Sequence, residues 1–514
     1  MAIASIAMIA TIALTLPHAF RATAHQVAGQ PKAVPAPAPR PVRPLVQLWL
    51  STADRRLRLE QQPDIEMVAS KDLPRDVVID THATYQSMVG FGAAMTDASA
   101  WLIKNRMNGL QRGALMREMF GPPPGLNMNI TRLTIGASDF SLKPYSLDDV
   151  SVGDTDVQLE HFNVKSNLGD VIPMMQEALA INPQLRVIAS PWSAPAWMKT
   201  SDNLISGELL KAYESVYAEY LVKYVDAYRG FGIPIFALTV QNEPAFEPAT
   251  YPGMAMPAAT RARFIGQYLG PDLARHAPKT EILGWDHNWD EPKQPLDVLA
   301  DPTVSRYIDG VAWHCYRGTP ATQSEVHRAH PKKDVYITEC SGGDWESARK
   351  GELMWFARDL LLAGIRHWAR GVVYWNLALD ENHGPHFGGC DNCKGVVTID
   401  SRTGQVSRND EYYAFAHFSR FVLPGAVRVG SSETDKELNN VAFEDPSDGS
   451  VTMVMVNSHV DARRVSVTQR PFGFQYTMPP QSVATFVWNP NPVGAWIRRA
   501  FRWWQGAREA AGRT

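Results

Sequence analysis

A carboxylate at the end of a short apolar run is the first feature of this sequence that could do chemistry. Within residues 236–244, Phe236, Leu238 and Val240 form an apolar run typical of a buried strand. Pro244 cannot continue a strand and disfavours helical backbone at Glu243, so Glu243 is expected where strand becomes loop. A lone glutamate is more often a surface residue. The C-terminal end of a buried parallel strand, however, is where a (β/α)8 barrel keeps its catalytic groups.

The elements that must position this carboxylate repeat along the middle of the chain. Eight strand-like runs, mostly with helical patterns between them, occupy residues 86–95, 129–137, 185–190, 235–241, 281–285, 310–315, 335–338 and 371–376. Strands that alternate with helices form parallel βαβ units, and eight such units close a barrel. We therefore predict an α/β fold with a (β/α)8 TIM barrel over residues 86–417. Its clearest helix is predicted over residues 206–229, with Ser206 as N-cap and its tyrosines packed on the barrel.

Short strands without long helical periods flank the predicted barrel on both sides. Residues 46–85 contain short alternating segments, and residues 418–490 contain the strand-like runs 451–456 and 482–488, with polar turns in the same region. This pattern is typical of an all-β sandwich. We expect that domain to support the barrel and to carry no chemistry.

Four segments together resemble a known family. They are Gly90-Phe-Gly-Ala-Ala-Met-Thr-Asp97, Ala189-Ser-Pro-Trp-Ser-Ala-Pro-Ala-Trp197, Gln241-Asn-Glu-Pro244 and Trp375-Asn-Leu-Ala-Leu379. In order and spacing they resemble glycoside hydrolase family 30, in its glucosylceramidase branch. The resemblance implies that Glu243 is the acid/base, at the end of barrel strand four. It also implies that the N-terminal and C-terminal strands form one β-sandwich.

A second carboxylate must face Glu243 in a retaining glycosidase. Such enzymes place two carboxyl groups about 5–5.5 Å apart, one protonated and one ionised. Glu339 follows the seventh strand, and the resemblance places the nucleophile there. The glycines at 342 and 343 allow the loop to turn away, whereas Asp334 precedes the strand and is expected at the opposite barrel end. We predict that Glu339 attacks the anomeric carbon while Glu243 protonates the departing oxygen.

The pairing of two carboxylates also predicts a pH dependence. The negative charge of Glu339 is expected to raise the pKa of Glu243, which falls again once Glu339 is esterified. A mildly acidic pH optimum follows from this expectation.

Further site residues come mainly from the resemblance. It implies that Asn242 bonds the sugar 2-hydroxyl, and that Arg132 and Tyr316 support Glu339. It also implies that Asp139 and Trp192 hold the 3- and 4-hydroxyls. We expect the indole that follows strand eight to form the floor of the subsite, at Trp375.

Three of the polar candidates keep an alternative interpretation. A buried arginine on a strand needs an acidic partner, so Arg132 could equally belong to a structural ion pair. His314 could be a core histidine or a ligand contact. Asp97 could be a sugar contact or a helix N-cap.

The four cysteines are too few for a disulfide scaffold in a chain of 514 residues. Cys390 and Cys393 lie close enough in sequence to form a local disulfide that pins the loop 384–393, where the chain departs from the family pattern. Cys315 and Cys340 are predicted to be small apolar fillers. No second Cys or His pair stands at zinc-site spacing, so we expect no metal and no organic cofactor.

The composition and the sequences of the two chain ends indicate which binding partners and which location to expect. A net charge of −3 argues against nucleic acid. An apolar run at residues 3–16 predicts a secretory signal peptide over 1–24, with an uncleaved anchor as the alternative, followed by a Pro/Ala-rich linker at 25–45. The basic aromatic tail at 491–514 could make weak contact with a membrane surface, dock on the protein, or stay disordered.

Together these features predict a secreted retaining β-glycosidase that cleaves β-glucosidic bonds in a glycolipid or β-glucan, as a glucosylceramidase does. An endo-β-1,6-glucanase of the same family is the near alternative. A non-catalytic carbohydrate-binding barrel is the alternative from a different class. Such a protein would be expected to lack one of the two carboxylates, and both are present.

Overall fold

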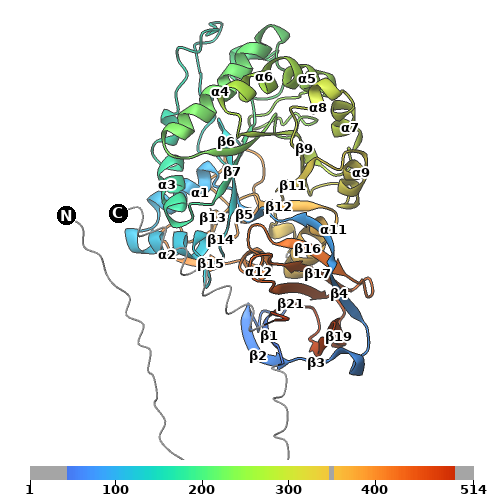
Figure 1. Ribbon diagram of the computed structural model, residues 1–514. Coiled ribbons are helices and arrows are strands. Elements are labelled where there is room, and N and C mark those ends of the chain that lie inside the picture. The colour runs from blue at the N-terminus through green and yellow to red at the C-terminus, as the bar shows by residue number, and fades with distance from the viewer. Residues whose placement is uncertain (1–42, 347–351, 492–514) are drawn as a thin grey trace, which may run out of the picture. The chain divides into compact units, whose positions relative to one another are not determined.

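The computed structural model describes residues 43–346 and 352–491 (Figure 1). The predicted signal peptide, most of the predicted linker and all but the first residue of the predicted tail lie outside these ranges. Among the helices of the described ranges, none combines the length and the apolar character that crossing a membrane requires.

Eight parallel strands form the barrel, as predicted. They are β5 (Gly90–Ala93), β6 (Ile130–Ile135), β7 (Arg186–Pro191), β8 (Ile235–Thr239), β9 (Glu281–Asn288), β10 (Gly310–His314), β11 (Asp334–Glu339) and β12 (Ala369–Tyr374). From β6 to β12 each strand pairs with the next along the chain, and β12 pairs with β5. Because all the strands run in parallel, their C-terminal ends gather at one face of the barrel.

Two glycines allow the barrel to close between β5 and β6. A Cβ on Gly92 would lie 1.8 Å from the carbonyl oxygen of Ile130, and one on Gly90 would lie 1.5 Å from Oδ1 of Asn129. The backbones touch through a 3.1 Å hydrogen bond from the Asn129 N–H to the Phe91 carbonyl. Close approach of two backbones is therefore the physical reason for the Gly-Phe-Gly segment.

Helices surround the strands (Figure 1). They are α1 (Asp97–Asn105), α2 (Gly109–Phe120), α3 (Val171–Ile181), α4 (Glu214–Gly230), α5 (Ala258–Phe264), α6 (Gly270–His276), α7 (Lys293–Leu299), α8 (Pro302–Ser305), α9 (Ala321–Ala329), α10 (Glu352–Trp355), α11 (Ala363–Arg366) and α12 (Asp410–Ser419). Two π-helical segments, Ile265–Leu269 and Phe356–Leu362, join α5 to α6 and α10 to α11.

The predicted start of α4 is wrong. The α-helix begins at Glu214, eight residues after the predicted N-cap. Ser206 has a φ of 55° and Gly207 a φ of 79°, so these residues form a turn instead of a helix start. The prediction for the tyrosine face holds, since Tyr217 and Tyr220 are fully buried in the core.

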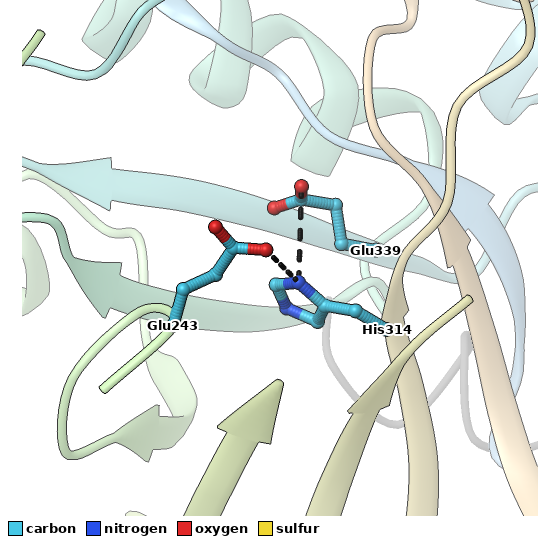
Figure 2. Close-up of side chains that lie close together, drawn as sticks. All are labelled: Glu243, His314 and Glu339. Carbon is cyan, nitrogen blue, oxygen red and sulfur yellow. Dashed lines mark hydrogen bonds and ion pairs between the residues drawn. The ribbon is translucent and has the colours of Figure 1, made fainter. Parts of the chain in front are cut away.

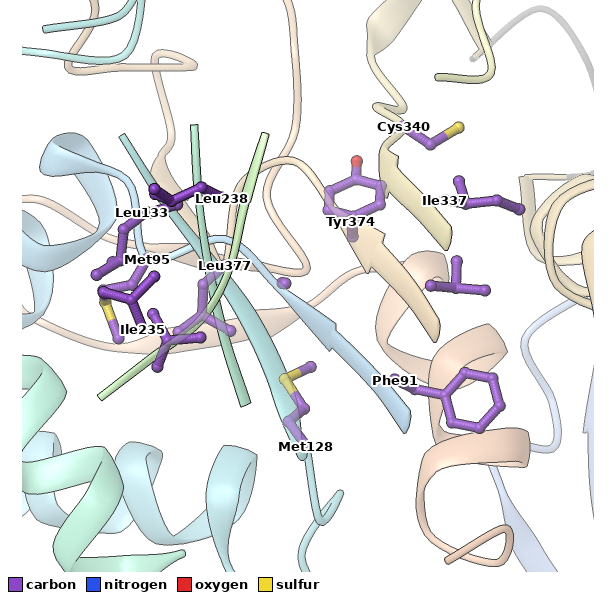
Figure 3. Packing of buried hydrophobic residues seen from close by; sticks show 14 of the residues in the cluster. Phe91, Met95, Met128, Leu133, Ile235, Leu238, Ile337, Cys340, Tyr374 and Leu377 are labelled. Atoms are coloured by element: carbon purple, nitrogen blue, oxygen red, sulfur yellow. The ribbon is translucent and has the colours of Figure 1, made fainter. Parts of the chain in front are cut away.

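Strand alternation separates two apolar layers. Ala237 and Tyr336 belong to a cluster inside the barrel. Their neighbours Leu238 and Ile337 belong to the larger cluster that contains the apolar faces of the helices (Figure 3). The parallel strands are thus buried on both faces, as βαβ units require.

The sandwich combines strands from both ends of the chain, as predicted. The N-terminal strands are β1 (Leu45–Thr52), β2 (Glu60–Glu66), β3 (Val68–Ala69) and β4 (Val77–Ser87). The C-terminal strands are β16 (Val427–Ser431), β17 (Leu438–Glu444), β18 (Val451–Asn457), β19 (Arg463–Gln469), β20 (Phe472–Met478) and β21 (Ser482–Trp488). The strand β1 pairs with all of β21 from Val46 to Thr52, which ties the two chain segments together.

A small third sheet follows the last barrel strand and was not predicted. It consists of β13 (Ala378–Asp380), β14 (Val397–Ile399) and β15 (Val406–Arg408). The loop 384–393 runs between β13 and β14, so this sheet fixes both of its ends.

Candidate active site

Glu243 and Glu339 come together at the C-terminal face of the barrel. A carboxylate oxygen of each and a ring nitrogen of His314 lie within 4.8 Å of one another. Figure 2 shows both carboxylates directed at the same nitrogen of the imidazole, Nδ1. Glu243 also has a φ of 45°, and its N–H donates to the Asp286 carbonyl at 2.9 Å. A left-handed backbone at a residue with a long side chain is uncommon, and such residues cluster at active sites.

Arg132 on β6 connects one of the two carboxylates to the rest of the site. Its Nη1 donates to Glu339 Oε2 at 2.5 Å, and its Nη2 donates to Asn242 Oδ1 at 2.7 Å and Asp286 Oδ2 at 2.8 Å. The remaining donor, Nε, bonds Ser190 Oγ at 3.0 Å. Arg132 is fully buried, so each of these bonds is shielded from water. Arg132 therefore makes both interactions that the sequence suggested: it supports Glu339, and it forms an ion pair with Asp286.

His314 bridges two carboxylates. Its Nδ1 lies 3.1 Å from Glu243 Oε1, and its Nε2 lies 3.1 Å from Asp286 Oδ1. Burial opposes a charge on the ring, but Glu339, Asp286 and Glu243 raise the pKa of His314 to about 9. The ring is therefore protonated on both nitrogens at neutral pH. An imidazolium has no lone pair to offer a metal, so these three side chains do not fit a metal site in this state.

The expected raised pKa of Glu243 is wrong. Burial alone would raise it, but the hydrogen bond from His314 and the positive charges of His314, His287 and Arg132 lower the pKa of Glu243 below its ordinary value. The sequence argument considered only the charge of Glu339. It could not include a buried cation in direct contact with Glu243.

Tyr316 makes the contact that was predicted for it. Its hydroxyl donates to Glu339 Oε1 at 2.9 Å and lies 3.4 Å from Ser341 Oγ. The Tyr316 N–H bonds Asn288 Oδ1 at 3.1 Å, which fixes the start of this loop. With Arg132, Tyr316 gives each oxygen of Glu339 one donor.

Two indoles form an aromatic wall beside Arg132. Trp192 and Trp375 stack with ring centroids 4.9 Å apart and an interplanar angle of 15°. The Arg132 guanidinium lies 4.8 Å from the Trp192 ring centroid. Asp139 is buried nearby, and burial with repulsion from Glu339 and Glu243 raises its pKa to about 8. Asp139 is therefore mostly neutral at pH 7 and able to donate a hydrogen bond.

The sequence interpretation missed Asp286, the most connected carboxylate of the site. It is fully buried on β9 and accepts from Arg132, His314, Thr338 Oγ1 at 2.6 Å and Ser190 Oγ at 3.1 Å. The predicted fifth strand ended at residue 285, whereas β9 continues to Asn288. A run of four polar or aromatic residues, Trp285-Asp-His-Asn288, was the signal that could have found it.

Asp97 is not a helix N-cap. It is the first residue of α1, and the capping side chain is Thr96, which accepts from the Ser99 N–H. Asp97 Oδ2 instead accepts from Ser141 Oγ at 2.6 Å and from the Tyr145 hydroxyl at 2.9 Å. It therefore anchors the loop that carries Asp139.

Both cysteine pairs form disulfides. The bridge between Cys390 and Cys393 agrees with the prediction. The prediction that Cys315 and Cys340 are separate apolar fillers is wrong, because they also form a disulfide, with Cα atoms 5.3 Å apart. They follow neighbouring strands, β10 and β11, and this proximity is invisible in a sequence separation of 25 residues.

The loop 384–393 reaches the site. The Phe387 N–H donates to the Asp139 carbonyl at 2.5 Å, and the Gly389 N–H donates to Thr250 Oγ1 at 3.3 Å. A Cβ on Gly389 would lie 2.5 Å from the Asp139 Cβ, so only glycine allows this approach. The disulfide loop therefore supports the backbone of Asp139.

Comparison with known proteins agrees with this geometry. The Glycosyl hydrolase family 30 TIM-barrel domain matches residues 88–422, and the family 30 beta sandwich domain matches residues 425–486. An endo-1,6-beta-D-glucanase of Neurospora crassa is 34% identical over 431 residues, which are 80% of this chain and 85% of that protein. The lysosomal acid glucosylceramidase of Mus musculus is 29% identical over 432 residues, 79% and 81% of the two chains.

A solved structure described as an endo-beta1,6-glucanase superimposes with a TM-score of 0.80 at 31% identity, covering 86% of this chain and 99% of that chain. The domain matches span the barrel and the sandwich, and the structural likeness extends over both. The chain is a glycoside hydrolase and belongs to glycosyl hydrolase family 30.

Proposed function

We propose that the protein is a retaining β-glycosidase in which Glu339 is the nucleophile and Glu243 the acid/base. The observation that carries this proposal is the close approach of the two carboxylates, whose oxygens lie within 4.8 Å of each other beside His314. Inverting glycosidases separate their carboxyl groups by about 6.5–9.5 Å to hold a water between them, and retaining enzymes by about 5–5.5 Å. The short separation favours direct attack on the sugar.

Glu339 is held in one orientation for this attack. Arg132 binds one of its oxygens and Tyr316 the other. Both donors hold the carboxylate oxygens in place, and the ionised carboxylate is the form that reacts. Attack on the anomeric carbon forms a glycosyl ester, while the bond to the leaving oxygen breaks.

The proton for the leaving group comes from the pair of Glu243 and His314. Before the reaction, His314 is protonated and donates to Glu243. A bound sugar removes water from Glu243, which favours its neutral form, so the proton moves across the 3.1 Å contact to Glu243. Glu243 passes it to the departing oxygen. It then deprotonates a water, which releases the sugar with retained configuration.

The remaining site residues are proposed to bind the sugar. Asn242 is fixed by Arg132 and would meet the 2-hydroxyl, whose hydrogen bond strengthens in the transition state. Asp139 and Trp192 would hold the 3- and 4-hydroxyls. Trp375, stacked on Trp192, would form the apolar floor.

Of the two substrates that the relatives suggest, we favour a β-1,6-glucan. Endo-1,6-beta-D-glucanases of Neurospora crassa and Aspergillus fumigatus are 34% and 35% identical to this chain. The mouse glucosylceramidase is 29% identical and a putative glucosylceramidase of Caenorhabditis elegans 30%. Glucosylceramide is the second candidate, supported by those two relatives.

We also propose that the protein acts outside the reducing cytosol. Both cysteine pairs are oxidised, and disulfides persist in secreted and periplasmic proteins. The apolar N-terminal run supports the same location. The proposed membrane contact of the tail falls on residues that the structure does not describe, apart from Asn491.

Three substrates offered side by side test this function: β-1,6-gluco-oligosaccharides, glucosylceramide and an aryl β-glucoside. We expect short β-1,6 oligomers as the main products, with the β-anomer appearing first in the proton NMR spectrum. Glucose released only from the lipid would favour the second candidate. An α-anomer as first product would contradict the retaining mechanism.

A further inference from the structure

A disulfide joins the two residues that are next in sequence to Tyr316 and Glu339. Glu339 is the proposed nucleophile, and Tyr316 orients it. Cys315 follows the last residue of β10 and precedes Tyr316, whereas Cys340 follows Glu339 at the end of β11. The bond between Cys315 and Cys340 therefore links the two strand ends next to the Tyr316–Glu339 hydrogen bond.

A β-bulge explains how Glu339 can face the site. Trp313 pairs with Ile337, but His314 pairs with Glu339, so Thr338 is an extra residue on β11. In a regular strand without the bulge, residues two apart face the same side, so Glu339 would face the same side as Ile337, toward the helices. With it, Thr338 and Glu339 both contact the polar site, at Asp286 and Arg132 respectively. Bulges beside active sites re-aim side chains in this way.

The same bulge turns Cys340 outward, whereas Cys315 faces outward by the ordinary alternation of β10. Cys340 is fully buried in the cluster between barrel and helices, and Figure 3 shows it pointing to the same side as Ile337. Cys315 packs against that cluster as well. The disulfide thus lies on the outer side of the barrel wall, and the reacting groups on the inner side. It can hold the strand ends without touching a substrate.

Few other backbone-to-backbone hydrogen bonds hold the end of β11 in the described structure. Its ladder with β12 ends at Ile337, three residues before Cys340. On the other side, the ladder with β10 ends at the bulged pair of His314 and Glu339. Beyond it, the Trp375 N–H bonds the Cys340 carbonyl at 3.0 Å. A one-residue slip in a strand exchanges inward and outward side chains, so this bulged end needs a fixed register.

We propose that the disulfide between Cys315 and Cys340 is a positioning element, which fixes the bulged register and keeps Glu339 against Tyr316. This inference rests on the proposed role of Glu339 as nucleophile. A consequence is sensitivity to reducing dithiols. A dithiol attacks the sulfur of Cys315, a half-buried residue, displaces the Cys340 thiolate and closes to its own disulfide. The protein gains two electrons and two protons as two thiols, and Glu339 loses its fixed orientation.

The test compares two double variants, Cys315→Ala/Cys340→Ala and the matched control Cys390→Ala/Cys393→Ala. We expect the first to lower kcat on an aryl β-glucoside about 10²-fold, because misplacement of a reacting group by about 1 Å costs that much. Its KM should change less than about threefold, since the groups proposed to bind the sugar remain in place. The control should retain kcat within about twofold and change mainly KM, because its loop supports Asp139.

A second readout separates positioning from folding and from the proposed function itself. A 2-fluoro-β-glucoside that traps the glycosyl ester reports the rate of attack by Glu339, and circular dichroism reports the fold. Slow labelling of a folded Cys315→Ala/Cys340→Ala protein supports the inference. Labelling at the wild-type rate overturns it. If even the wild-type protein is never labelled at Glu339, the proposed function fails instead.

Should the double variant not fold, the wild-type protein provides the same test. It is treated with dithiothreitol while folded, and mass spectrometry of alkylated peptides shows when the bond between Cys315 and Cys340 opens. A loss of kcat that follows this opening and reverses on reoxidation supports the proposal. Unchanged kcat with the bond fully open overturns it.

Discussion

The carboxylates at the two ends of the same barrel strand, β11, differ in their exposure and in the number of their partners. On β11, Asp334 stands at the first residue and Glu339 at the last. Asp334 forms an ion pair with Arg370, which also donates to Ser87, and both charged side chains are 27% exposed. Glu339 is paired with the fully buried Arg132, and its own side chain is 7% exposed. One end of the strand has a partly hydrated pair, and the other has a buried network.

The difference indicates what each end is for. Buried charges lose their hydration, and replacing such a network with apolar groups is often neutral or stabilising. A network of Arg132, His314, Asp286 and two glutamates is therefore not explained by stability. It places fixed charges and donors where charge changes during a reaction, which is the arrangement that catalysis requires. At the amino end, the pair of Asp334 and Arg370 needs no more than a structural explanation.

The largest expected effect follows from removing the charge of Glu339 without changing its size. Glu339→Gln should lower kcat by about 10⁴-fold or more, because the nucleophile is lost. Steady-state kinetics on an aryl β-glucoside measures this. The matched control on the same strand is Asp334→Asn, which should stay within about twofold of wild type. Equal losses of kcat in both variants would contradict the claim that only the C-terminal end of β11 takes part in catalysis.

Glu243→Gln should have the next largest effect. We expect a loss of about 10²- to 10⁴-fold, the usual contribution of a general acid/base. The loss should shrink for aryl glucosides with strongly acidic leaving groups, since these depart without a proton. A loss that is independent of the leaving group would argue against proton donation by Glu243.

Asp286→Asn tests whether the carboxyl-end network acts as a unit. It leaves Arg132 and His314 with one fewer anion in a buried site. We expect the free energy of unfolding to fall by about 3 to 5 kcal/mol, the usual effect of removing one partner of a buried ion pair. Denaturant titration measures the stability, and kinetics should show reduced kcat as well. A stability loss below about 1 kcal/mol would mean that the network is not tightly coupled.

The charge on His314 predicts a pH dependence of stability. Its pKa of about 9 in the folded protein lies above the ordinary value of 6.5. The stabilisation is therefore fully present below about pH 6.5 and is lost as the pH rises through 9, by up to about 3 kcal/mol. Comparing urea titrations of wild type and His314→Gln from pH 6 to pH 10 isolates this contribution. Parallel pH curves for the two proteins would contradict a charged His314.

The smallest effect is expected at the amino end. Arg370→Met removes the partner of Asp334, and partly exposed ion pairs contribute about 0–1 kcal/mol. The midpoint of thermal unfolding should shift by only a few degrees, and kcat should not change. A loss of activity here would show that the two strand ends are coupled.

The sequence predicted those parts of the molecule that local pattern determines. Eight apolar runs located eight barrel strands, and the strand ends together with the family resemblance located Glu243 and Glu339. Asp286 was missed because β9 continues three residues beyond the apolar run that defined it. The disulfide of Cys315 and Cys340 depends on strand pairing, and the lowered pKa of Glu243 depends on a histidine from another strand. The disulfide and the lowered pKa both arise from contacts between segments that are distant in sequence, so no single stretch of sequence could predict them.

The central claim is that Glu339 becomes covalently bonded to the sugar. The most direct measurement is peptide mapping by mass spectrometry after incubation with a 2-fluoro-β-glucoside, which slows hydrolysis of the ester. The account predicts one added fluoroglucosyl group per chain, carried by the peptide that contains Glu339 and lost slowly as activity returns. An adduct on Glu243 or Asp286, or turnover of the unmodified sugar with no adduct at all, would contradict it.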